Sequence, residues 1–192
     1  MDTYNAKRSM AGRSARANGQ LFENMIIDSA RFYESRAISV IDKTPEPVRI
    51  IGVSNRNKGQ FIACFEKKAQ PDFKGILQDS TMILFDAKHT DKDRIRREVV
   101  TDEQEKCFER YMSMGAMCFL VVSLGFRKYY RVPWVVFRDM KKIYGHAYMG
   151  ENELSTYKIN YTDGVLRFLD GVELKEGGRE SEDHEVRNCE GN

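Results

Sequence analysis

The stretch LFDAKHT, residues 84–90, decides the fold predicted for this chain, because it closes a continuous apolar run with a charged pair. A continuous apolar run indicates a central strand that is buried on both faces. Side chains alternate along a strand, so Asp86 and Lys88, two residues apart, are expected on one face. The stretch QPDFKG, residues 70–75, places a second carboxylate, Asp72, where the chain is expected to enter the sheet.

Hydrophobic periodicity on either side of this strand predicts an α/β domain with a mixed central β-sheet flanked by helices. A capping box, Thr101 followed three residues later by Gln104, marks the start of one helix, and Gly115 is suited to end it. Two strands on either side of the polar turn 55–59 predict a hairpin. The other expected elements are a helix over 19–36, strands over 80–87, 117–124 and 127–132, and a helix that opens at Pro133.

The two ends of the chain carry opposite charge. Residues 1–18 are polar and basic and are expected to form a flexible arm, and residues 19–160 form the main domain. Residues 161–192 are expected to be a C-terminal extension, with a disordered acidic tail from about residue 177. This asymmetry suggests that an anionic partner meets the front and the body, although two solubilising tails would give the same pattern.

Bulk composition bounds the class of protein. With 192 residues, of which 41% are hydrophobic, the chain is one ordinary domain with enough apolar material for a core. The four cysteines form no C-x-x-C pair, so neither a zinc site nor a redox motif is indicated. We find no signal peptide, and the longest apolar run is too short to span a bilayer. A cytoplasmic protein that meets no membrane is therefore expected.

The residues Asp72, Asp86 and Lys88 suit a hard divalent cation. Mg²⁺ prefers oxygen ligands, and proteins commonly supply one or two carboxylates, here with the Ala87 carbonyl nearby. A lysine beside the metal can hold the attacking water or neutralise phosphate charge in the transition state. This is the minimal equipment for metal-dependent phosphodiester hydrolysis. A solvated charge pair at a strand rim and an ordinary turn would have the same sequence.

Two further residues join this set. Glu23 lies at the edge of the apolar stripe of the first helix, and Gln104 lies on the helix after the strand; an exposed carboxylate and a helix cap are their simpler explanations. In order and approximate spacing, Glu23, Pro71-Asp72 and Asp86-x-Lys88 resemble the PD-(D/E)xK nuclease pattern. More narrowly, the chain resembles the RecU family of Holliday-junction resolvases, in the blocks 19–26, 70–75, 85–90, 118–126 and 130–134 and in Gln104.

The resemblance implies a restriction-endonuclease-like core that acts as a homodimer. It also implies cleavage of four-way junction DNA by two symmetric nicks, with Mg²⁺ or Mn²⁺ as cofactor. Asp72 and Asp86 would be the metal ligands, Lys88 the lysine of the motif, Glu23 the acidic residue of the first helix and Gln104 a helix glutamine near the site. The family often has Glu where this chain has Asp86, which is one methylene shorter, so metal preference or position can differ.

A projecting stalk that enters the junction is also implied, and residues 55–69 match it. Its lysines would contact phosphates and make the affinity fall with salt, and exposed phenylalanines could stack on splayed bases. Two phenylalanines in the core of one strand face, and an inert arm, are the simpler alternatives. The candidate DNA contacts are Arg13 and Arg16 in the arm and Lys58, Phe61, Phe65, Lys67 and Lys68 in the stalk.

The sequence leaves other functions open. One is another nuclease of the same superfamily, such as a restriction-type or repair nicking enzyme. Another is a DNA-binding recombination-accessory protein with an idle nuclease site, which would bind junctions without nicking them. A homodimer is expected because a two-fold enzyme matches a symmetric cut, and a recombinase is left open as a further partner.

Overall fold

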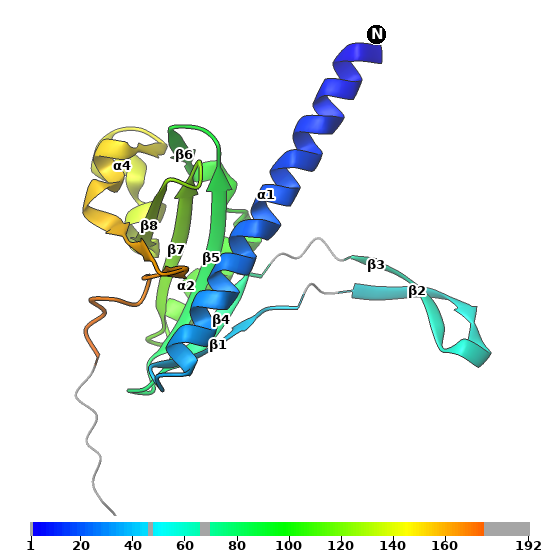
Figure 1. Cartoon of the computed structure of the whole chain (residues 1–192), viewed down its shortest axis with the longest axis horizontal. Coiled ribbons are helices and arrows are strands. Elements are labelled where there is room, and N and C mark those ends of the chain that lie inside the picture. Colours follow the sequence, from blue (N-terminus) through cyan, green and yellow to red (C-terminus); the bar gives the residue numbers. More distant parts are fainter. Residues whose placement is uncertain (1, 46–47, 66–69, 175–192) are drawn as a thin grey trace, which may run out of the picture.

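The centre of the computed structural model is a six-stranded mixed sheet (Figure 1). The structure describes residues 2–45, 48–65 and 70–174, with backbone alone for residues 2–11 and Phe65. The strand order is β1-β4-β5-β7-β8-β10, and all neighbours are antiparallel except the parallel pair β5 and β7. The strands are β1 (Ser39–Lys43), β4 (Phe73–Leu77), β5 (Met82–Thr90), β7 (Met117–Leu124), β8 (Lys128–Pro133) and β10 (Lys158–Ile159). The predicted α/β class with a mixed sheet is confirmed.

Helix α1 (Asp2–Glu34) packs on one face of the sheet (Figure 1). Its apolar side chains, among them Phe22 and Ile26, are fully buried against strand residues such as Phe85. The sequence predicts that this helix begins at Gly19 after a flexible arm. The backbone is instead one continuous helix from Asp2. The prediction relied on the apolar stripe, which stops near Gly19. A helix that has already formed can be extended by residues that are merely compatible with helix, so it can continue beyond its apolar stripe.

Three helices cover the opposite face: α2 (Asp102–Met112), α3 (Trp134–Arg138) and α4 (Met140–Tyr144). They bury Phe108, Trp134 and Phe137 against the sheet. The predicted capping box at the start of α2 is confirmed. The single helix predicted from Pro133 is instead two short helices, because the backbone of Asp139 leaves helical geometry, with φ −93° and ψ 12°.

Strands β2 (Val48–Asn55) and β3 (Gln60–Phe65) form the predicted hairpin, which projects away from the sheet (Figure 1). Its turn is a 3-10 helix, η1 (Arg56–Lys58), that ends at Gly59 with the positive φ of 62° expected of a glycine there. The projection begins at Val48, earlier than the predicted stalk, because β2 forms its first half. Lys67 and Lys68 lie outside the described residues.

The remaining elements complete the body. They are β6 (Arg94–Arg96), η2 (Arg97–Val99), β9 (Tyr148–Gly150), α5 (Glu151–Leu154), η3 (Ser155–Tyr157), β11 (Tyr161–Thr162) and β12 (Val165–Leu166). Leu166 and Phe168 are fully buried, and the Phe168 ring lies 5.2 Å from that of Tyr33 on α1. The core therefore continues past residue 160, where we had predicted that an extension begins. The predicted acidic tail lies outside the described residues, and no helix in the described part is long and apolar enough to cross a membrane.

Candidate active site

Asp86 and Lys88 lie on β5, on the face that α2 covers. Asp86 is fully buried, and the Lys88 ammonium forms an ion pair with its Oδ2, while 20% of the Lys88 side chain stays exposed. The prediction that period two brings these side chains together is confirmed.

Asp72 comes directly before β4, and the register of β4 against β5 sets its position. Phe73 pairs with Phe85, and their rings stack with centroids 5.0 Å apart. The backbone N–H of Asp72 donates to Asp86 Oδ1 (3.1 Å), and the backbone N–H of Ala87 donates to Asp72 Oδ2 (3.0 Å). Each carboxylate thus accepts a hydrogen bond from the backbone at or next to the other aspartate, and the two lie next to each other.

Gln104 reaches the same carboxylate from α2. Its Nε2 donates to Asp86 Oδ1 (2.9 Å), and its Oε1 accepts from the backbone N–H of Thr101 (3.2 Å). Only 3% of Gln104 is exposed. One amide therefore caps the helix and also orients Asp86, so the cap and the site residue that the sequence suggested are the same side chain.

Burial and neighbouring charge shape the protonation of the site. Burial and the charge of Asp86 raise the pKa of Asp72 to about 7, against the opposing effects of Lys88 and the Ala87 N–H. Burial alone would lower the pKa of Lys88, but the charges of Asp86, Asp72 and Glu23 outweigh it, and the pKa is raised. Lys88 is therefore a cation at neutral pH, where Asp72 is close to its own pKa of about 7.

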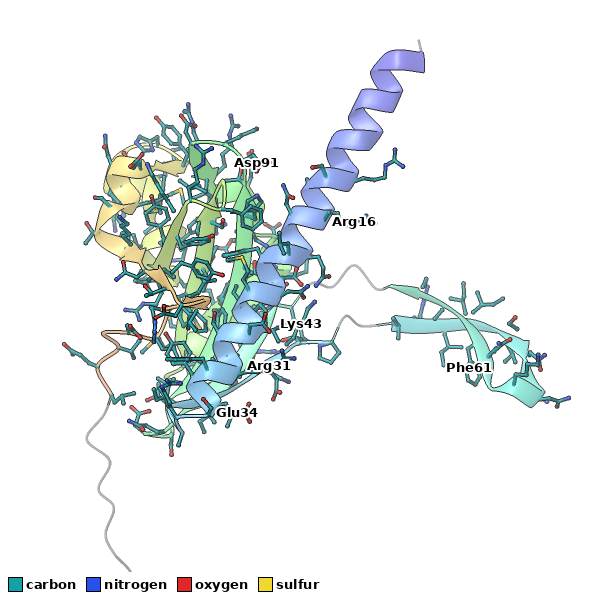
Figure 2. The ribbon with its side chains drawn as sticks, in the orientation of Figure 1. Arg16, Arg31, Glu34, Lys43, Phe61 and Asp91 are labelled. Atoms are coloured by element: carbon teal, nitrogen blue, oxygen red, sulfur yellow. The ribbon has the colours of Figure 1, made fainter. Side chains whose placement is uncertain are left out.

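Glu23 lies near this site, and its described ion pair is with a lysine outside the cluster. Its carboxylate forms an ion pair with Lys43 Nζ (2.6 Å), at the end of β1, and acts on Lys88 through its charge. The adjacent Thr44 N–H donates to the Asp72 carbonyl (2.8 Å), so β1 borders the site. We missed Lys43, which Figure 2 labels beside α1, because β1 was not predicted; the apolar residues Ile38, Val40 and Ile41 before Pro45 were the available signal.

The donor set fits a hard divalent cation. Carboxylate oxygens from Asp72 and Asp86 are brought together and are the ligands that Mg²⁺ prefers. Within the described ranges, no three His, Cys, Asp or Glu side chains gather around one point. A metal here would thus rely on two carboxylates, with backbone carbonyl oxygen or water completing its coordination.

The predicted DNA contacts lie away from the carboxylates. Phe61 and Lys58 are on the projecting hairpin, and 56% of Phe61 is exposed, so the alternative of a core phenylalanine is wrong at this position. Arg13 and Arg16 are exposed on α1. Figure 2 labels Arg16 and Phe61 on these two projections. The side chain of Phe65 lies outside the described part, and a role in DNA binding stays a prediction for all of these residues.

The paired strands β4 and β5, with Asp72 entering one and Asp86-x-Lys88 on the other, have the arrangement of the PD-(D/E)xK nuclease motif. The family model described as Recombination protein U matches residues 17–172, and the chain belongs to this family.

Individual relatives extend this result. The chain is 24% identical over 178 residues to a protein named Holliday junction resolvase RecU from Bacillus pumilus, covering 88% of this chain and 86% of the relative. The relative of the same name from Bacillus subtilis is 23% identical over 187 residues, covering 91% and 90%. Against the one from Streptococcus gordonii the identity is 29% over 111 residues, covering 56% of this chain and 55% of the relative, so the chain spans about half of that protein's length.

A solved structure also aligns with the chain. It is that of Archaeoglobus fulgidus Hjc, a Holliday junction resolvase, with a TM-score of 0.45 and 10% identity, covering 72% of this chain and 93% of that one.

Proposed function

We propose that this chain is a structure-selective, metal-dependent endonuclease that resolves four-way DNA junctions by paired symmetric nicks in recombination or repair. The observation that carries the proposal is the cluster that Asp72 and Lys88 form around the fully buried Asp86. The names of the relatives, each a Holliday junction resolvase, support the choice of substrate. Mg²⁺, with Mn²⁺ as the alternative, is the proposed cofactor.

Each residue of the cluster has a chemical task in this proposal. The metal supplies Lewis-acid chemistry when bound, and Asp72 and Asp86 would hold it. Lys88 carries positive charge to the place where a scissile phosphate would gain negative charge. Gln104 holds Asp86 in one orientation, because its amide is itself fixed by the start of α2. Glu23 and Lys43 border the site as an ion pair.

A homodimer is part of the proposal. Two symmetric nicks across a junction need two sites related by a two-fold axis, which a C2 dimer provides. The hairpin supports the junction as substrate, because apolar side chains, among them Phe61 (Figure 2), are exposed along it and could stack on bases opened at a junction centre.

The test is a cleavage assay on a mobile four-way junction with and without Mg²⁺, with both nicks mapped. The wild type should make two symmetric cuts only with metal, and Asp72→Asn should bind the junction without cutting it. Asp28→Asn, an equal change at a carboxylate that is 64% exposed and lies outside the site, is the matched control and should cut like the wild type.

Each alternative function gives a different result in this assay. Cutting by Asp72→Asn would show that the site is wrongly assigned. Equal cutting of linear duplex would identify another nuclease of the same superfamily. Salt-sensitive binding without nicking in any metal would identify an accessory protein with an idle site.

A further inference from the structure

The ribbon formed by β6 and β9 has two different faces. Ile95 and Met149 pair across it and are buried in the core on the α2 side of the sheet. Arg96 lies opposite Tyr148 in the same register, and Arg94 is the next residue on the same face. The outer face of the ribbon therefore presents two arginines around one aromatic ring.

The rings hold one of these arginines in place. The Arg94 guanidinium lies over the Tyr148 ring, 5.0 Å from its centroid. The His146 ring stacks on Tyr148 with centroids 3.9 Å apart and planes 11° apart, and the Tyr148 carbonyl lies 2.8 Å from His146 Nδ1. A guanidinium held over a braced ring loses less conformational freedom when it binds a ligand.

In the described part of the chain, the ion pairs of these arginines are weak. Arg94 Nε contacts Asp93 at 3.2 Å and Arg96 contacts Glu98 at 3.5 Å, and both carboxylates are more than 70% exposed. Exposed ion pairs of this kind are weak and are screened by salt, so a phosphate can displace them. The exposed residues Lys141 and Lys142 on α4 add positive charge at the same end of the molecule (Figure 1).

The ribbon follows directly on the strand that carries the site. β5, which carries Asp86, leads into β6 after three residues. Just beyond β6, Arg97 forms an ion pair with Glu105 (2.7 Å) on α2, beside the Gln104 that holds Asp86. Ribbon and carboxylates thus lie on the same side of the sheet and are tied to the same helix.

We propose that the outer face of the β6–β9 ribbon is a further DNA-binding surface, on which Arg94 and Arg96 bind the phosphate backbone of a duplex arm beside the cut. The identity of the ligand as DNA rests on the proposed function. Guanidinium groups suit this ligand because they bind phosphate oxygens in a bidentate manner. The surface differs from the hairpin, which would meet the junction centre, and from α1.

The test is the double variant Arg94→Gln/Arg96→Gln, with binding to a four-way junction measured over a range of salt concentrations without divalent metal. Each lost phosphate contact should reduce the slope of log K against log salt by about 0.9, so the double variant should lose roughly 2. Its affinity at low salt should fall roughly tenfold or more. Hydroxyl-radical footprints should lose one protected stretch beside each of the two cuts.

Two controls separate this result from a general charge effect. Arg31→Gln/Arg36→Gln removes the same charge from the other end of the body, where Figure 2 labels Arg31 far from the β5–β6 connection at Asp91, and it should keep the wild-type slope. Arg94→Lys/Arg96→Lys should recover most of the slope, and a thermal melt reports whether each variant is folded.

The outcomes distinguish this inference from the proposed function. If the wild type binds and cuts junctions but the ribbon variant matches the Arg31/Arg36 control in slope and footprint, the ribbon inference is overturned and the function stands. If the wild type neither binds nor cuts junctions, the proposed function is overturned, and the ribbon inference that rests on it is overturned as well.

Discussion

Replacing Lys88 by methionine should destabilise the metal-free protein, because it leaves the charge of Asp86 buried without a cation. Asp86 is fully buried, and breaking such a pair typically costs about 3–5 kcal/mol. Two donors to Asp86 Oδ1 remain, from the Asp72 backbone and from Gln104, and 20% of the Lys88 side chain is exposed. Both facts reduce the cost, so we expect roughly 3 kcal/mol of unfolding free energy to be lost.

The assay is urea unfolding in chelator for the wild type, Lys88→Met, Asp86→Asn and the double variant. The double variant should be more stable than Lys88→Met, because a neutral amide beside methionine leaves no buried charge, and the coupling energy should be roughly 2 kcal/mol. Added Mg²⁺ should stabilise Lys88→Met, since a cation that binds only the folded form shifts the unfolding equilibrium. Stability of Lys88→Met within about 1 kcal/mol of the wild type, with no coupling in the cycle, would refute the reasoning.

Three further outcomes are expected. Phe61→Ala should weaken junction binding roughly tenfold through lost base stacking but leave the melting temperature unchanged, because the side chain is exposed; unchanged affinity in a gel-shift titration would count against the hairpin as a DNA contact. Gly75→Ala should lower the unfolding free energy by about 1–3 kcal/mol, since the new Cβ would meet the Val40 carbonyl oxygen at 2.3 Å, and an unaltered urea midpoint would contradict this packing. Burial would raise the pKa of Glu109, but hydrogen bonds from Trp134 and Arg138 outweigh it, and the pKa is lowered. The ionised Glu109 therefore stabilises the fold above the unfolded pKa of 4.5, and this stabilisation is lost as the pH falls through the lower folded pKa. Glu109→Gln should therefore differ most from the wild type near neutral pH and converge with it in acid, and a constant difference across a pH series of thermal melts would contradict the linkage.

The residues of the candidate site were predictable wherever one local rule fixed them. The alternation of side chains placed Asp86 and Lys88 on one face, and the spacing of Thr101 and Gln104 marked the start of α2. The second role of Gln104 could only be suspected from a resemblance, since contact with Asp86 depends on how α2 packs on the sheet.

What the sequence did not reveal depends on contacts between distant segments. Lys43 lies on a five-residue strand whose identity comes from pairing with β4, and so short a segment carries little periodicity of its own. The core position of Phe168 depends on Tyr33, more than a hundred residues earlier. The extent of α1 was missed because polar residues that continue a packed helix leave no apolar stripe.

Because α1 is one continuous helix, the direction in which its basic side chains point depends on the number of residues that separate them from the packed part of the helix. Arg13 and Arg16 are three residues apart and so lie on neighbouring positions of one helix side. Among the described side chains, the helix is tied to the body by Asn18, whose amide donates to Asp91 (3.4 Å), and by the buried Phe22. A loose arm would tolerate an inserted residue, but one residue added to this helix between Arg16 and Asn18 would turn both arginines by about 100° and advance them by about 1.5 Å. The number of residues between the arginines and Asn18 therefore sets the direction in which the two positive charges face.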